Sequence, residues 1–151
     1  MNEELLPANW IWCKVKDITL ATPKEIRDDN LDVGFVPMKE VENGIHSRHG
    51  FKTRKWKEIK KGYTQFSDED ILLARITPCF ENKKASIAKG LPNGKGAGST
   101  ELFVLRAIKE LLHPELLFFF FKTKKFLENG TQAMTGAVGQ QRVPKKFILD
   151  Q

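Results

Sequence analysis

The sequence lacks several features that define common protein classes. It has only two cysteines, Cys13 and Cys79, and neither lies in a Cys-x-x-Cys pair. A disulfide scaffold and the usual four-ligand zinc site are therefore excluded, and we expect reduced thiols in a cytoplasmic protein. The longest apolar run, residues 116–121, is far shorter than the ~20 residues that cross a membrane. Because residues 1–4 are acidic and not apolar, we expect no signal peptide.

What the chain does contain is typical of one globular domain. Its 151 residues match the usual domain size. Hydrophobic residues make up 40% and charged residues 29%, a balance that argues against disorder. The formal net charge is +6 and the pI is near 9.3. This charge favours an anionic partner, although solubility alone also explains it.

The order of apolar runs and turns predicts a small α+β domain. Asn43-Gly44 and residues 67–70 indicate turns, and Pro114 suits the first turn of a helix that Gly130 ends. Residues 134–142 are too rich in glycine for regular structure. The segment 52–63 is predicted as a loop with a short strand after Gly62, and 92–98 as a flexible loop. The predicted strands are 10–15, 34–38, 71–76, 84–89 and 100–106, and the predicted helix is 114–129.

Positive charge is concentrated in residues 52–61, which read KTRKWKEIKK. Clustered lysine and arginine neutralise phosphates, so this stretch is typical of nucleic-acid binding. Phe51, Trp56 and Tyr63 lie among these cations and either stack on bases or anchor the segment in the core. A solvated charged surface is the alternative interpretation of the same stretch.

Two other motifs indicate catalysis more weakly. The glycines at 94, 96 and 98 lack the Gly-Lys-Ser/Thr ending of a phosphate-binding loop. Asp70, Glu81 and Lys83 have the residue types with which some nucleases bind Mg²⁺ and activate water. A metal-dependent DNA nuclease is therefore one alternative function, although Pro78 interrupts the strand that should carry the second acid.

The motifs together resemble a known family. ITPCFEN (residues 76–82), GSTE (98–101) and GQQRVP (139–144) occur in this order, after a Leu-Pro-x-x-Trp-x-Trp opening at residue 6. The combination resembles the target recognition domain of type I restriction-modification specificity subunits, over essentially the whole chain. Small departures are Glu69, where the family often has glycine, and Lys83, where glycine often follows the Glu-Asn pair.

The resemblance implies a non-catalytic DNA reader. Residues 1–151 would form a single target recognition domain with a twisted, mixed sheet and a few helices. It would be half of the usual two-domain subunit, without the spacer helix. It would recognise one half of a bipartite double-stranded DNA site. The modification (methyltransferase) and restriction subunits would be its partners, and those subunits, not this chain, would bind S-adenosylmethionine, ATP and Mg²⁺. A module that dimerises to rebuild the bipartite reader is a further alternative.

Site residues follow from the resemblance and the charge pattern. The motifs themselves are expected to hold the scaffold, with residues 77–82 turning the chain and Glu101 pairing with a cation. The loop 136–142 is expected either to approach DNA or to close the sheet. We expect no catalytic or metal-binding residue. Sequence choice is assigned to Arg48, His49, Lys52, Arg54 and Lys55; phosphate contacts to Lys60, Lys61, Lys83 and Lys84; further DNA contacts to Tyr63, Gln140, Gln141 and Arg142.

Overall fold

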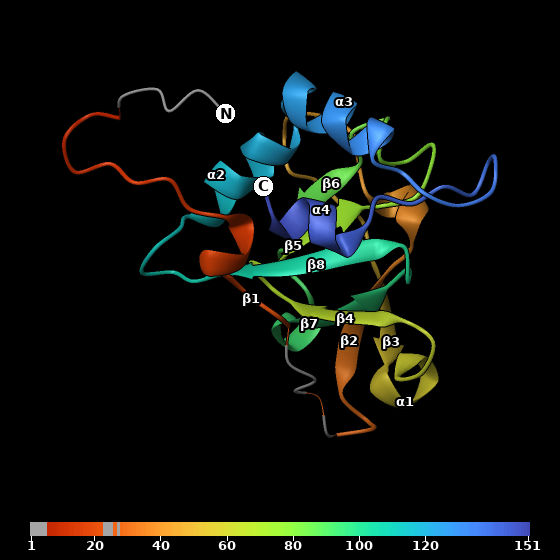
Figure 1. Ribbon diagram of the computed structural model, residues 1–151. Coiled ribbons are helices and arrows are strands. Elements are labelled where there is room, and N and C mark those ends of the chain that lie inside the picture. Colours follow the sequence, from red (N-terminus) through yellow and green to blue (C-terminus); the bar gives the residue numbers. More distant parts are fainter. Residues whose placement is uncertain (1–5, 23–25, 27) are drawn as a thin grey trace.

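Two four-stranded sheets form the centre of the molecule (Figure 1). The computed structural model describes residues 6–22, 26 and 28–151, so residues 1–4, on which the signal-peptide prediction depends, lie outside it. The first sheet is antiparallel and has the order β1 (Thr19–Leu20), β8 (Leu102–Ala107), β5 (Ile71–Ala74), β6 (Ala85–Ile87). The second has the order β3 (Lys52–Lys55), β2 (Asp32–Val36), β7 (Lys95–Gly98), β4 (Thr64–Ser67). The α+β class with mixed strands is confirmed.

The helices lie on the outer faces of the two sheets. Three of them, α2 (Pro114–Phe121), α3 (Lys124–Gln132) and α4 (Lys145–Leu149), lie on the free side of the first sheet, and α1 (Trp56–Ile59) lies beyond the second sheet (Figure 1). The short 3-10 turns are η1 (Val15–Asp17), η2 (Met38–Glu40) and η3 (Pro92–Gly94). Within the described residues, none of the helices combines the length and apolar character needed to span a bilayer.

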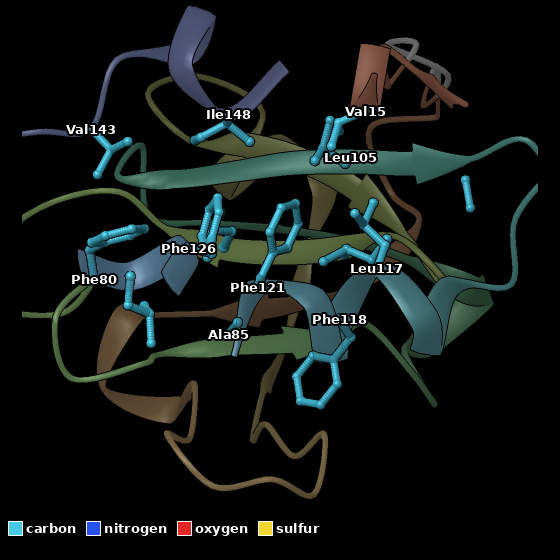
Figure 2. Close-up of a cluster of buried hydrophobic side chains, with 14 of the residues drawn as sticks. Val15, Phe80, Ala85, Leu105, Leu117, Phe118, Phe121, Phe126, Val143 and Ile148 are labelled. Atoms are coloured by element: carbon cyan, nitrogen blue, oxygen red, sulfur yellow. The ribbon is translucent and has the colours of Figure 1, made fainter. Parts of the chain in front are cut away.

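Strand β5 is buried on both of its faces, as the unbroken apolar run predicts. Ile71 and Leu73 face the helices, while Leu72 faces the second sheet. On the helical side, Phe80, Phe121 and Phe126 fill the space between strands and helices (Figure 2). The helices and the second sheet are thus fixed to opposite sides of one strand.

The glycine-rich segment 92–98 contains the 3-10 turn η3 and the interior strand β7, so its prediction as a flexible loop is wrong. β7 runs parallel to β2 and antiparallel to β4. Gly98 approaches β2 so closely that an added Cβ would lie 2.2 Å from the carbonyl oxygen of Val36. Close packing therefore requires glycine here. The strand escapes sequence detection because it carries few side chains from which a period could be read.

The predicted helix 114–129 is two helices. Thr123 has an extended backbone and begins α3, with its hydroxyl accepting from the Phe126 N–H at 3.4 Å. Gly130 lies inside α3, so its assignment as the helix end is wrong. On α2, Phe118 and Phe121 are buried, whereas Phe119 is 52% exposed. The apolar run is therefore buried on one side of the helix and exposed on the other.

Two further predictions at the strand level are wrong. Residues 10–15 form no strand, and Trp10 and Trp12 are 68% and 73% exposed because no neighbouring strand pairs with this segment. The segment 52–63 is not a loop, since β3 pairs with β2 and is followed by α1. The Glu58 carboxylate accepts from the Lys55 N–H at 3.1 Å and so stabilises the start of that helix. The strand after Gly62 is confirmed as β4.

Candidate nucleic-acid interface

The edge strand β3 carries the basic stretch into solvent. All four of its residues are exposed, and the strand pairs only with β2. Alternation places Lys52 and Arg54 on one face of this edge and Thr53 and Lys55 on the other. Because β2 is antiparallel, Lys52 lies opposite Phe35 and Arg54 opposite Val33. The fold therefore sets two cations side by side on the outer face of the second sheet.

Aromatic side chains lie beside these cations. The rings of Phe35 and Tyr63 meet edge to face, with centroids 4.9 Å apart, and Tyr63 is 42% exposed. Trp56 is 3% exposed, so of its two predicted roles the structure supports that of a core anchor. Phe35, which lies opposite Lys52, thus contacts a half-exposed tyrosine that can stack on a base or pack against a sugar.

The sequence prediction missed Gln65 on the same face. Gln65 lies opposite Ala97, which in turn neighbours Phe35, and its side-chain oxygen is buried without a hydrogen-bond partner among the described residues. The sequence carried one signal for Gln65: it lies two residues after Tyr63, a spacing that puts two side chains on the same side of an extended segment.

Several lysines predicted to contact DNA instead bind partners within this chain. Lys55 forms an ion pair with Asp32 at 2.9 Å, and Lys60 contacts both carboxylate oxygens of Asp29 at 2.7 and 2.9 Å. Lys84 donates to the Met38 carbonyl at 3.2 Å. Among the described residues, by contrast, these predicted cations make no side-chain hydrogen bond or ion pair: Arg48, Lys52, Arg54, Lys61 and Lys83. Free cations are the ones available to an external phosphate.

A half-buried lysine that the sequence analysis did not single out lies next to Lys83. The ammonium of Lys122 donates to the carbonyl oxygens of Lys83 and Ala85 and lies 5.0 Å above the Phe118 ring. Burial and, to a smaller extent, the positive charge of Lys83 lower the pKa of Lys122 to about 8. Lys122 therefore ties α2 to β6.

The loop 136–142 is held to the sheet by an ion pair. The guanidinium of Arg142 contacts both oxygens of Glu101, with distances of 2.6 to 3.0 Å, and also donates to the Gln140 carbonyl at 3.0 Å. The hydrogen bond from Arg142 holds the pKa of Glu101 below its usual value. The expected cation partner of Glu101 is thus Arg142. These contacts favour the structural role of Arg142, while Gln140 is exposed and the Gln141 carbonyl accepts from the Thr77 N–H.

The predicted nuclease residues do not come together. Asp70 is fully buried and accepts two hydrogen bonds from Arg106. It precedes β5, whereas Glu81 lies in the turn that follows the strand, roughly 15 Å or more along the chain direction at ~3.3 Å per residue. The described residues contain no group of three histidine, cysteine or acidic side chains arranged for a metal ion. The geometry gives the nuclease alternative no support.

Comparison with known proteins gives a consistent answer. No family model matches the chain. It is 43% identical over 144 residues to the type I restriction enzyme EcoAI specificity subunit and 45% identical over 144 residues to the EcoEI specificity subunit, both from Escherichia coli. The matches cover 95% of this chain. This chain is homologous to a segment of type I restriction enzyme specificity subunits. It spans about a quarter (24%) of the length of these curated relatives.

Solved structures share the fold of this chain. The HsdS subunit from Thermoanaerobacter tengcongensis superposes with a TM-score of 0.72 at 20% identity, over 99% of this chain and 38% of that one. A chain from a structure on complex assembly and conformational transition of the type I R-M system gives 0.73 at 21% identity, over 96% and 37%. The architecture expected from the family resemblance is therefore confirmed. The matches do not test which side chains meet DNA, so the individual site residues stay predictions.

Proposed function

We propose that this chain recognises one half of a bipartite double-stranded DNA target in a type I restriction-modification system. The observation that carries the proposal is the 43–45% identity to specificity subunits across 95% of the chain. The exposed cations of β3 and the half-exposed Tyr63, which contacts Phe35 of the neighbouring strand, support it because cations and an aromatic ring suit a phosphate backbone and its bases.

The chain acts in this proposal as a reader without catalysis of its own. It directs the modification and restriction subunits to a site, and those subunits supply the chemistry that needs S-adenosylmethionine, ATP and Mg²⁺. The separation of Asp70 from Glu81 agrees with this division of labour. No observation in the structure favours the dimerising module over the DNA reader.

Selection from random duplex DNA tests the proposal. The purified chain is incubated with a random duplex library at low salt without Mg²⁺, and the retained DNA is sequenced. We expect enrichment of one short contiguous motif, the half-site. Retention without any enriched motif would leave only a sequence-independent phosphate binder. No retention at low salt would contradict DNA recognition by this chain.

The matched control is a double variant of the β3 edge. Lys52→Ala with Arg54→Ala removes the two cations of the outer face, and Lys124→Ala with Lys125→Ala removes two exposed lysines of α3. We expect retention to fall in the first variant and to persist in the second. Equal loss in both would show that net charge alone, not the β3 surface, drives binding.

A further inference from the structure

A short hairpin precedes the basic strand. Val41 and His49 form an antiparallel bridge, the Glu42 N–H donates to the Arg48 carbonyl at 3.1 Å, and the Gly50 N–H donates to the Glu40 carbonyl at 3.0 Å. We call residues 41–49 the recognition hairpin. Its tip contains the Asn43-Gly44 turn, and residues 42–48 are all exposed. A hairpin so exposed needs contacts elsewhere if it is to keep one orientation.

Two side chains of the recognition hairpin attach it to the edge of the first sheet. The Ser47 hydroxyl accepts from the Ile87 N–H at 2.5 Å, and the His49 Nε2 accepts from the Lys89 N–H at 3.0 Å. β6 is an edge strand, so the outward N–H groups of this stretch have no strand partner on that side. The side chains of residues 47 and 49 satisfy the N–H groups of residues 87 and 89 at the same two-residue spacing. Ser47 and His49 thus supply the hydrogen-bond acceptors that a neighbouring strand would supply at this edge.

These contacts also define the state of His49. An Nε2 that accepts from Lys89 carries no proton, so the ring proton lies on Nδ1, which is 3.3 Å from the Gly50 carbonyl oxygen. Charged groups around the ring are Lys39, Glu40, Glu42, Arg48 and Lys89, which line the same shallow hollow. His49 is thus occupied by the protein on both nitrogens and has no free nitrogen with which to read a base.

Two other side chains of the recognition hairpin are exposed. Ser47 and His49 bind the backbone N–H groups of residues 87 and 89, whereas His46 and Arg48 lie at the surface. The Arg48 side chain makes no hydrogen bond or ion pair within the described part of the chain. An arginine held at the surface by a fixed backbone is suited to the paired acceptors of guanine in the major groove.

We propose that the recognition hairpin is a specificity element in which Ser47 and His49 are positioning residues and Arg48 and His46 contact the bases. The inference rests on the proposed DNA-recognition function. It departs from the sequence-based assignment of His49 as a base contact, and it adds Ser47 and His46, which that assignment omitted.

The first measurement concerns the attachment alone and needs no DNA. Amide hydrogen exchange of Ile87 and Lys89 is followed by NMR in the whole chain. Ser47→Ala should speed exchange at Ile87 and His49→Ala at Lys89, each by about tenfold or more, corresponding to a lost hydrogen bond. Ser47→Thr, which keeps the hydroxyl, should restore protection. His113→Ala, an exposed histidine before α2, is the control and should change neither amide. Unchanged exchange in Ser47→Ala and His49→Ala would overturn the attachment.

The second measurement concerns specificity. Affinities are compared for the selected half-site and for duplexes with single base-pair changes. Arg48→Ala should lose discrimination at one position, by about tenfold or more, with exchange at Ile87 and Lys89 unchanged. Ser47→Ala and His49→Ala should lower the same discrimination while low-salt affinity for unrelated DNA stays the same. Ser47→Thr should restore it.

The outcomes separate the two proposals. A wild-type chain that selects a motif, together with variants of residues 47–49 that keep full discrimination, overturns the role of the hairpin and leaves the proposed function intact. A wild-type chain that selects no motif overturns both the proposed function and the base-contact role. The exchange data would in that case still report whether Ser47 and His49 hold the hairpin.

Discussion

Arg106 donates two hydrogen bonds to the buried carboxylate of Asp70, from Nε to Oδ1 at 2.8 Å and from Nη2 to Oδ2 at 3.0 Å. The Asp70 side chain is 1% exposed, and its Oδ2 also accepts from the Ser67 N–H at 2.7 Å. This pair connects the turn between β4 and β5 to β8. It therefore helps to fix the second sheet relative to the first.

We expect Arg106→Ala to destabilise the fold by about 3 kcal/mol, because it leaves a buried carboxylate without its charged partner. Urea denaturation measures the change. Lys109→Ala is the control, since it breaks the exposed Lys109–Glu69 pair nearby and should cost less than about 1 kcal/mol. Similar losses in the two variants would contradict the role given to the buried pair.

Gly130→Ala should destabilise α3, although alanine normally stabilises a helix interior by up to ~1 kcal/mol over glycine. The added Cβ would lie 2.3 Å from the buried Phe80 ring, so the ring or the helix must shift. We expect a loss of about 2 kcal/mol, typical of overpacking. Thermal or urea unfolding provides the test. Asn129→Ala, one residue earlier and exposed, should be neutral or slightly stabilising; a stabilising Gly130→Ala would refute the close contact.

The lowered pKa of Lys122 makes the stability of the fold change with pH in the alkaline range. Its pKa is lowered from 10.5 to about 8 in the folded chain, so between these values the unfolded chain binds the proton more strongly. Stability must then rise with pH across roughly 8 to 10.5. Denaturation of wild type and Lys122→Met at pH 7 and pH 10 should show that wild type gains relative to the variant. If the difference in stability between wild type and Lys122→Met is the same at both pH values, the lowered pKa of Lys122 is wrong.

The neighbouring lysines Lys60 and Lys61 should differ in their effect on DNA binding. Asp29 neutralises Lys60 at 2.7 Å, whereas the Lys61 side chain has no such partner among the described residues. Lys61→Ala should therefore reduce the slope of log affinity against log salt by about one unit. Lys60→Ala should reduce it by less. Fluorescence anisotropy at a series of salt concentrations measures these slopes. Equal slopes for the two variants would contradict the neutralisation of Lys60 by Asp29.

The sequence predicted the elements whose side chains carry a clear pattern. The apolar run at residues 71–74 gave β5, and Pro114 gave the start of α2. It failed where the pattern was missing or misleading. β7 has almost no side chains to reveal its burial, and Trp10 and Trp12 alternate like a strand but have no strand beside them. Thr123 divides a continuous apolar and basic run only because its hydroxyl begins a new helix.

The same division holds for the candidate site. The sequence located the basic stretch at residues 52–61, because charge clustering is a local property of the chain. Whether one of these cations is free of intramolecular partners does not depend on its neighbours in the sequence. Lys55 and Lys60 meet Asp32 and Asp29, and these acids come from a distant part of the chain. His49 likewise loses both nitrogens to backbone groups, one of which is 40 residues away.

By itself, the sequence determined the family resemblance, the α+β class and the position of the positive charge, since each depends on short local patterns and on their order along the chain. Only the tertiary structure decided which side chains face outward and which are engaged. Hydrogen bonds and ion pairs between distant segments make that choice. The pairing of Ser47 and His49 with the edge of β6, and of Arg142 with Glu101, exists only once the chain has folded.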